Sequence, residues 1–148
     1  MVAGLAERLC SLNDYSKMAP QPTPETQPFW DGLKEGKLML QRGKSSGKAY
    51  FPPRPFFPGD PSQEVEWFEA SGRGTLHTYV ISHRPPPGFE APFSIAVVEL
   101  EEGPRIQTNI VDCPQTPEAL RLDMPVVLAP HRVNDDITLP LFRPAQEN

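Results

Sequence analysis

Proline occupies 20 of the 148 positions in this chain, which limits the possible folds more than any other feature of the sequence. Proline fixes the backbone angle φ and removes an amide donor, so it interrupts helices and is kept out of central strands. We therefore expect short helices, many turns and extended connections. The run Ala19–Pro24 alternates proline with other residues and predicts an extended linker. Residues 1–24 are accordingly interpreted as an N-terminal extension that ends in this linker.

A short amphipathic helix is predicted over residues 23–36. A threonine can cap its start, a proline suits its first turn, and Gly36 can end it in the left-handed conformation. Phe29, Trp30 and Leu33 share one face of this helix. The aromatic side chains either pack on the chain's own domain or dock on a partner, and the sequence favours neither alternative.

The pattern after the helix is that of short strands. Ile106, Thr108 and Ile110 alternate with polar residues, as in a strand with one buried face. The predicted strands are Leu38–Gln41, Ala49–Phe51, Val65–Glu69, Thr75–His83, Phe93–Glu101, Arg105–Asp112, Pro125–His131 and Leu139–Phe142. The last five suit a small Greek-key barrel, and the OB-fold is the common five-stranded form. The predicted fold is therefore mainly β, with an OB-fold barrel over residues 69–148.

Between the helix and the barrel, the sequence has the spacing of two zinc knuckles without their ligands. Gly43 and Ser46 form one pair, and Phe57 and Asp60 form the other, each with two residues between them. Paired cysteines at this spacing supply the four ligands of a structural zinc ribbon. None of the four positions is cysteine, and two weak oxygens would not hold the metal. Residues 25–68 are thus predicted to be the helix plus a degenerate, rubredoxin-like zinc ribbon, with zinc not expected.

Loss of the metal has to be offset by other contacts. A structural zinc contributes about 10–16 kcal/mol in finger peptides, whereas burying one aromatic side chain contributes about 1.5–3 kcal/mol. Prolines at compatible sites add about 0.4–1 kcal/mol each. The ribbon offers Tyr50, Phe51, Phe56 and Phe57 together with four prolines. Since these contributions fall short, we hypothesise that the ribbon also leans on a partner surface.

Charge and reactive residues favour a binding role over catalysis. The net charge of −5 argues against nucleic-acid binding, which usually needs a basic face. A local excess of basic residues between positions 34 and 54 is either solvated surface or a site for an anionic small molecule, such as a nucleotide-bearing thioester. The three histidines stand alone, and no catalytic triad or phosphate-binding loop is recognised. No catalytic residues are expected.

Cysteine usage and hydropathy indicate where the chain resides. Cys10 and Cys113 are far apart and do not form a disulfide framework, so both are expected to be reduced in a cytoplasmic setting. No apolar run is long enough to span a membrane, and the first 12 residues lack the continuous apolar core of a signal peptide. We therefore expect no membrane partner.

Several segments in one colinear order, covering about residues 25–144, resemble a known family. They are Pro28–Leu33, Gly36–Leu38, Phe51–Pro55, Trp67–Thr75, His83–Pro85, Ala96–Arg105, Asn109–Asp112 and Thr138–Pro144. The family combines a rubredoxin-like zinc ribbon with an OB-fold. It is catalogued as domain of unknown function 35 and described as acyl-CoA-associated. Its four zinc cysteines map onto Gly43, Ser46, Phe57 and Asp60, where this chain departs from the pattern.

This resemblance implies a subunit of a larger enzyme. Family members assemble with thiolase-fold partners, which include acyl-CoA thiolases, acyltransferases and lipid-transfer-protein-type aldolases that shorten steroid side chains. The partner carries the catalytic residues, and the small subunit stabilises it and helps to build the acyl-CoA channel. The chain is thus expected to serve a steroid side-chain retro-aldolase in a hetero-oligomer. The CoA thioester would be the substrate of the complex, and no cofactor is expected.

The predicted site residues follow from this interpretation. Phe29, Trp30, Tyr50 and Phe57 are predicted to form the partner interface. The side chains of two arginines, Arg54 and Arg84, are predicted to contact the phosphates of CoA, because guanidinium groups bind phosphate in a bidentate manner.

Three alternatives stay open. The chain could be the OB-fold subunit of an acyl-CoA thiolase or acyltransferase. It could also be an independent OB module that binds single-stranded nucleic acid, which requires a basic groove with stacking aromatics. A free-standing enzyme is the third alternative.

Overall fold

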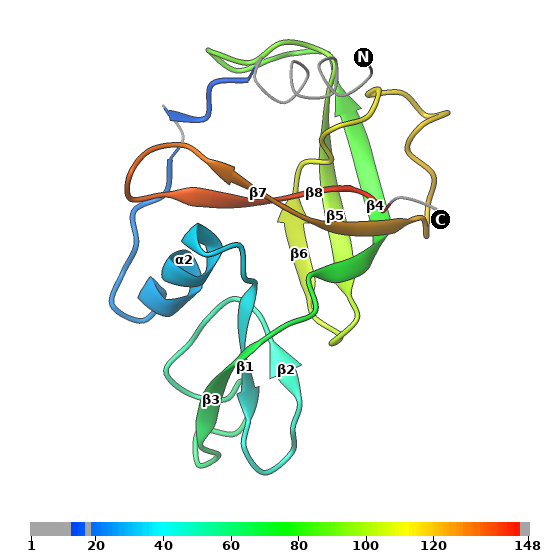
Figure 1. Cartoon of the computed structure of the whole chain (residues 1–148). Coiled ribbons are helices and arrows are strands. Elements are labelled where there is room, and N and C mark those ends of the chain that lie inside the picture. Colours follow the sequence, from blue (N-terminus) through cyan, green and yellow to red (C-terminus); the bar gives the residue numbers. More distant parts are fainter. Residues whose placement is uncertain (1–12, 17–18, 146–148) are drawn as a thin grey trace.

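The computed structural model describes residues 13–16 and 19–145. Most of the N-terminal extension predicted for residues 1–24, including Cys10, lies outside the described residues. The described part is mainly β, with one short helix and two separate sheets, which confirms the predicted fold class. Figure 1 shows the smaller sheet below the larger one, with the helix beside the junction.

The two sheets divide the chain into a ribbon and an OB domain. Strands β1 (Met39–Gly43), β2 (Ala49–Tyr50) and β3 (Val65–Glu69) form the ribbon sheet in the order β2-β1-β3. The OB domain has the order β6-β5-β4-β7-β8, and all neighbouring strands are antiparallel. Its strands are β4 (Arg73–Ser82), β5 (Phe93–Leu100), β6 (Arg105–Thr108), β7 (Pro125–Arg132) and β8 (Thr138–Pro144). The chain passes from one sheet to the other between residues 69 and 73.

The larger sheet curls until its two edges meet. Beyond β6, Ile110 forms a parallel bridge with Phe142 of β8. The amide of Val111 donates to the Phe142 carbonyl at 2.8 Å, and the Phe142 amide donates to the Asn109 carbonyl at 3.2 Å. The alternation predicted for this segment is confirmed, since Ile106, Thr108 and Ile110 are all buried. This closure is what a five-stranded OB-fold requires.

Helix α2 (Gln27–Lys34) is shorter than the predicted span. Its N-cap position is Thr26, but the Thr26 hydroxyl does not cap the helix and instead hydrogen-bonds with Thr23. Gly36 ends the helix as predicted, with a φ of 78°. The Lys37 amide then donates to the Gly32 carbonyl at 2.8 Å, which satisfies an otherwise unpaired group of the last turn.

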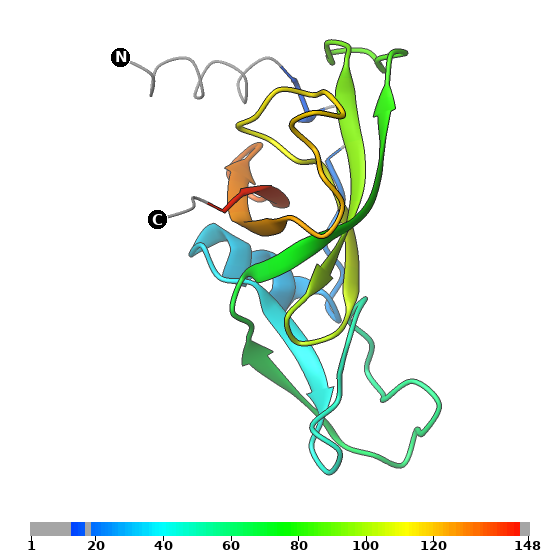
Figure 2. The same cartoon turned by 90° about the vertical axis from the view of Figure 1, so that its right-hand side faces the viewer.

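A single apolar core joins the helix to both sheets. It contains Phe29 and Leu33 from α2, Leu40 from β1, and Val98 and Phe142 from the OB domain. Helix α2 contacts β1, β7 and β8, and Figures 1 and 2 show it at the junction of the two sheets. The ribbon is therefore supported by the chain's own OB domain, an internal support that the sequence had not indicated.

The prolines of the larger sheet lie where they disturb little. Pro130 of β7 and Pro140 of β8 face each other in the β7–β8 register. β7 pairs with β4 only over residues 125–127. Pro130 lies beyond that pairing, so its missing amide hydrogen breaks no hydrogen bond to β4. β8 is the outer strand of the sheet order. This placement follows the rule that prolines within sheets avoid positions that need an amide donor.

Candidate functional site

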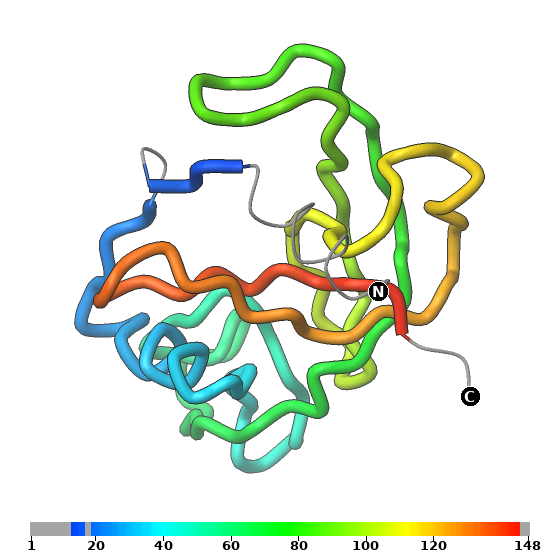
Figure 3. Tube along the Cα trace, turned by 45° about the horizontal axis from the view of Figure 1, so that its top comes forward, coloured from blue at the N-terminus to red at the C-terminus, as the bar shows by residue number. Residues whose placement is uncertain are grey.

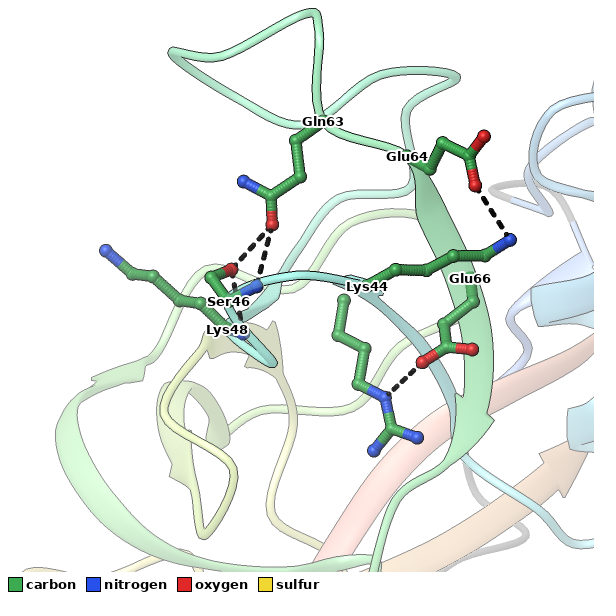
Figure 4. A network of polar contacts seen from close by, with 7 residues as sticks. Lys44, Ser46, Lys48, Gln63, Glu64 and Glu66 are labelled. Atoms are coloured by element: carbon green, nitrogen blue, oxygen red, sulfur yellow. Dashed lines mark hydrogen bonds and ion pairs between the residues drawn. The ribbon is translucent and has the colours of Figure 1, made fainter.

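The four positions with zinc-knuckle spacing lie in two loops: Gly43 and Ser46 at the β1–β2 turn, and Phe57 and Asp60 in the loop before β3. Gly43 ends β1, and a Cβ atom there would lie only 1.9 Å from Oε1 of Gln63. The Gln63 carbonyl oxygen instead accepts hydrogen bonds from the Ser46 amide at 3.2 Å and the Ser46 hydroxyl at 2.7 Å (Figure 4). Glycine at position 43 therefore leaves room for an amide side chain that links the first knuckle to the segment after the second.

The second knuckle is held by its own short-range contacts. The Asp60 carboxylate accepts hydrogen bonds from the Ser62 hydroxyl at 2.6 Å and the Ser62 amide at 3.2 Å. The bond from the Ser62 side chain is the main reason that the pKa of Asp60 is lowered. The ring of Phe57 packs edge-on against Tyr50, with centroids 5.6 Å apart.

The donor set at these positions does not fit a structural zinc. Gly43 and Phe57 have no side-chain donor, and the oxygens of Ser46 and Asp60 are engaged by Gln63 and Ser62. Within residues 13–16 and 19–145, no three His, Cys, Asp or Glu residues gather closely enough to hold a metal ion. Side-chain hydrogen bonds hold the residues at these positions in the described part of the chain.

A buried glutamine fixes the loop between β2 and β3. Gln41 is only 5% exposed, and its Oε1 accepts a hydrogen bond from the Arg54 amide at 2.7 Å. The Tyr50 hydroxyl donates to the Arg54 carbonyl at 3.1 Å. Burial raises the pKa of Tyr50, although the nearby Arg54 guanidinium acts in the opposite direction. The backbone of Arg54 is thus held on both sides.

Sequence reasoning missed both glutamines. Gln41 bonds to a residue 13 positions away, and Gln63 bonds to one 17 positions away. Such pairings leave no periodic signal, and a glutamine in a strand normally indicates a solvent-exposed position. A signal for them would have required knowing which strands pair.

One face of the ribbon carries a ladder of ion pairs. Arg42 pairs with Glu66 at 3.0 Å, and Lys44 pairs with Glu64 at 3.1 Å (Figure 4). The Arg42 guanidinium also lies 4.7 Å from the centre of the Phe68 ring. Lys44 and Glu64 are exposed, and Arg42 and Glu66 are partly exposed, so each pair is expected to contribute no more than about 1 kcal/mol.

A cavity of about 480 Å³ lies between the ribbon and the β5–β6 turn. It brings together three predicted residues, Tyr50, Arg54 and Phe57. Its remaining lining consists of Lys48, Ala49, Phe51, Pro58, Glu102, Gly103, Pro104 and Arg105. Figure 2 shows the loop after β2 and the β5–β6 turn on the same side of the molecule.

The charges around this cavity are unevenly compensated. Arg105 pairs with Glu99 at 3.0 Å, and Glu102 accepts hydrogen bonds from Ser71. Lys48 and Arg54 are exposed and form no ion pair within the described residues. Two uncompensated cations beside aromatic rings can receive an anionic group that carries a flat ring.

The other predicted residues lie outside this cavity. Phe29 is 3% exposed and packs against Trp30 and Phe51, so its ring belongs to the chain's own core. Trp30 is half-buried against the same core, and part of its side chain is exposed. Arg84 is exposed in the β4–β5 loop, which Figure 1 shows at the end of the OB domain opposite the ribbon. The structure therefore does not bring Arg54 and Arg84 together.

Cys113 is not poised as a nucleophile. Burial and the neighbouring Asp112 carboxylate raise the pKa of its thiol to about 11. The thiol therefore stays protonated at neutral pH, whereas a reactive cysteine needs a lowered pKa. In addition, no helix within residues 13–16 and 19–145 has the length and apolar character needed to cross a membrane.

A ribbon packed on an OB-fold, with a cavity between the two parts, defines this chain as a two-part β protein. Residues 67–129 match the family described as "ChsH2, C-terminal OB-fold domain". A "DUF35 domain-containing scaffold protein" of Methanocaldococcus jannaschii is 39% identical over 72% of this chain and 77% of its own length. The chain belongs to the DUF35 family.

Two curated relatives are longer proteins. A "Probable enoyl-CoA hydratase alpha subunit" of Thermomonospora curvata is 39% identical over 79% of this chain. The "3-oxo-4,17-pregnadiene-20-carboxyl-CoA hydratase alpha subunit" of Mycobacterium tuberculosis is 37% identical over 78% of this chain. The chain spans only 37% and 36% of their lengths, respectively.

Two solved structures have a similar fold. A chain of the "Ltp2-ChsH2(DUF35) aldolase" has a TM-score of 0.74 and 35% identity, covering 84% of this chain and 98% of that one. A DUF35 protein of unknown function from Sulfolobus solfataricus has a TM-score of 0.59 at 12% identity, covering 89% and 93% of the two chains. The second similarity supports the fold alone.

Proposed function

We propose that this chain is a non-catalytic subunit that stabilises a thiolase-fold enzyme and helps to form its acyl-CoA site. The observation that carries the proposal is the similarity to the chain of the Ltp2-ChsH2(DUF35) aldolase, which extends over 98% of that chain. The curated scaffold protein supports the same type of role, because a scaffold acts through assembly. The resulting hetero-oligomer would be cytoplasmic.

The preferred partner is a retro-aldolase of steroid side-chain degradation. This chain aligns with nearly the whole aldolase-associated chain but with only 36% of the pregnadiene-carboxyl-CoA hydratase subunit. Most of the hydratase subunit therefore has no counterpart in this chain. A thiolase or acyltransferase partner is the alternative, since the ribbon and its cavity would serve any thiolase-fold subunit that binds a CoA thioester.

The cavity between ribbon and OB domain is the proposed contact with CoA. The uncompensated side chains of Lys48 and Arg54 would bind its phosphates, and the rings of Tyr50 and Phe57 would lie beside its adenine. The Tyr50 hydroxyl and the Gln41 side chain hold the Arg54 backbone, which would limit how far this part of the loop has to move on binding CoA. Trp30 and Phe57 are retained as proposed partner contacts.

Co-expression of this chain with a thiolase-fold aldolase subunit tests the proposal. We expect the two proteins to co-purify as a stable complex that cleaves a steroid acyl-CoA, while this chain alone has no activity. Zinc measured in the same sample should be far below one equivalent. A stable lone monomer that never captures the partner would contradict the subunit role, and one equivalent of zinc would contradict the side-chain account of the ribbon.

Substitution of Arg54 tests the contact with CoA. Because a hydrogen bond to a charged group contributes about 1.5–3 kcal/mol, Arg54→Ala should weaken the binding of CoA to the complex by about tenfold or more. Arg84→Ala serves as a matched control at the other end of the OB domain and separates the two original candidates. Isothermal titration of the complex with CoA measures both. Unchanged affinity in both variants would remove arginine–phosphate contacts from the proposal.

A further inference from the structure

A second pocket, of about 390 Å³, lies on the side of the OB domain away from the ribbon cavity. Its walls are mainly apolar and include Phe89, Phe93, Ile95, Leu139 and Leu141. Among residues 13–16 and 19–145, none that lines the pocket carries a charge. Its volume lies within the range of about 300–1,000 Å³ that is usual for small-molecule sites.

The position of this pocket in the fold is that of a ligand site. In OB-folds, the second and third strands and the loop between the first and second strands form the usual binding face. The corresponding elements are β5, β6 and the β4–β5 loop, and all three contribute to the pocket. Oligonucleotide binding would need cations on this face, whereas the described lining residues of the pocket are uncharged.

An aromatic ring of the chain already lies at one end of the pocket. Tyr15 is 6% exposed, and its ring packs against Phe89 at 4.7 Å and against His131 at 5.1 Å between centroids. The ring of Phe89 in turn lies 5.4 Å from that of Phe93. Aromatic rings therefore form one end of the pocket.

The segment that carries Tyr15 is tied to the β4–β5 loop. The Asp14 amide donates to the Gly88 carbonyl at 2.9 Å, and the Glu90 amide donates to the Asn13 side chain at 2.9 Å. Figure 3 shows this segment between the β4–β5 loop and the β7–β8 hairpin. The pocket thus has a cover made by the chain itself.

Few polar side chains of the lining are available to bind a polar atom of a ligand. The Asn109 amide is already used as a donor to the Ser94 carbonyl. The Gln107 amide, on the exposed face of β6, makes no side-chain hydrogen bond within the described residues. One amide donor at the edge of an apolar pocket suits a ligand with a single oxygen at one end.

We propose that this pocket binds an uncharged, compact ring system whose edge carries a carbonyl oxygen, with the Gln107 amide as its donor. Steroid ketones belong to this chemical class. The proposal does not depend on the acyl-CoA role, because the pocket shares no lining residue with the ribbon cavity. It assigns a second ligand site to the chain.

Progesterone is a suitable probe, titrated against the full-length chain by calorimetry or by ligand-observed NMR. We expect one site with a dissociation constant of about 10 µM, the value that ordinary ligand efficiency gives for a molecule of this size. Ile95→Trp should fill the pocket and weaken binding by about tenfold or more. Val97→Trp is the matched control, since Val97 is half-buried on the same face of β5 but does not line the pocket.

A second variant keeps the test decisive if the tryptophan disturbs folding. Gln107→Ala changes an exposed side chain and should weaken progesterone binding by about threefold or more. No binding up to the solubility limit of progesterone, or equal binding by the wild type and both the Ile95 and Gln107 variants, would overturn the proposal. Failure of the chain to capture a thiolase-fold partner would leave this result unaffected, so the two proposals are tested separately.

Discussion

Replacing Phe29 by alanine is expected to lower the free energy of unfolding of the isolated chain by about 3–5 kcal/mol. The Phe29 ring is 3% exposed and contacts the rings of Trp30 and Phe51, in the core that joins α2, the ribbon and the OB domain. Its removal would leave a cavity at the junction of both sheets. Urea denaturation of wild type and variant, without any partner, measures the loss.

Trp30→Ala provides the matched control for this prediction. Trp30 is the adjacent residue and equally aromatic, but it is half-buried, so its truncation should cost the isolated chain clearly less. It should instead weaken partner binding if the exposed part of its ring is the docking surface. Unchanged stability in Phe29→Ala together with lost partner binding would favour the docking alternative for Phe29.

Features of the fold that depend on neighbouring residues could be predicted from the sequence. The alternation of Ile106, Thr108 and Ile110 predicted a one-sided strand, and Gly36 predicted the helix end, because both depend only on neighbouring residues. The proline content predicted short helices, and the helix α2 has only eight residues. The predicted threonine cap is not formed, because the Thr26 hydroxyl hydrogen-bonds with Thr23 and not with the first turn of the helix.

The parts that sequence could not supply all depend on which segments meet in space. The position of Phe29, in the core or at an interface, depends on the packing of α2 between two sheets. The cover formed by Tyr15 depends on a hydrogen bond between residues 13 and 90. Similarly, the sequence predicted the same phosphate contact for Arg54 and Arg84. The fold places Arg54 at the ribbon cavity and Arg84 in the β4–β5 loop.

The ribbon illustrates the same limit and leads to the second large effect. Gln41→Leu keeps the side-chain volume but removes the acceptor for the Arg54 amide, which a buried oxygen now satisfies at 2.7 Å. Loss of this part-buried hydrogen bond is expected to cost about 0.5–1.5 kcal/mol. We therefore expect the free energy for opening the β2–β3 loop to fall by that amount, and hydrogen exchange at the Arg54 amide to accelerate accordingly.

Arg42→Met is the control for this prediction, because Arg42 is the next residue on β1 and points to the opposite face, where its ion pair with Glu66 is partly exposed. Loss of an exposed pair should change the opening free energy by no more than about 1 kcal/mol. Equal exchange rates in the two variants would mean that the Gln41 amide does not hold the loop. If the ribbon also packs on a partner, binding of that partner should restore slow hydrogen exchange in the Gln41→Leu ribbon. The partner surface would then supply the restraint that the Gln41 amide no longer gives.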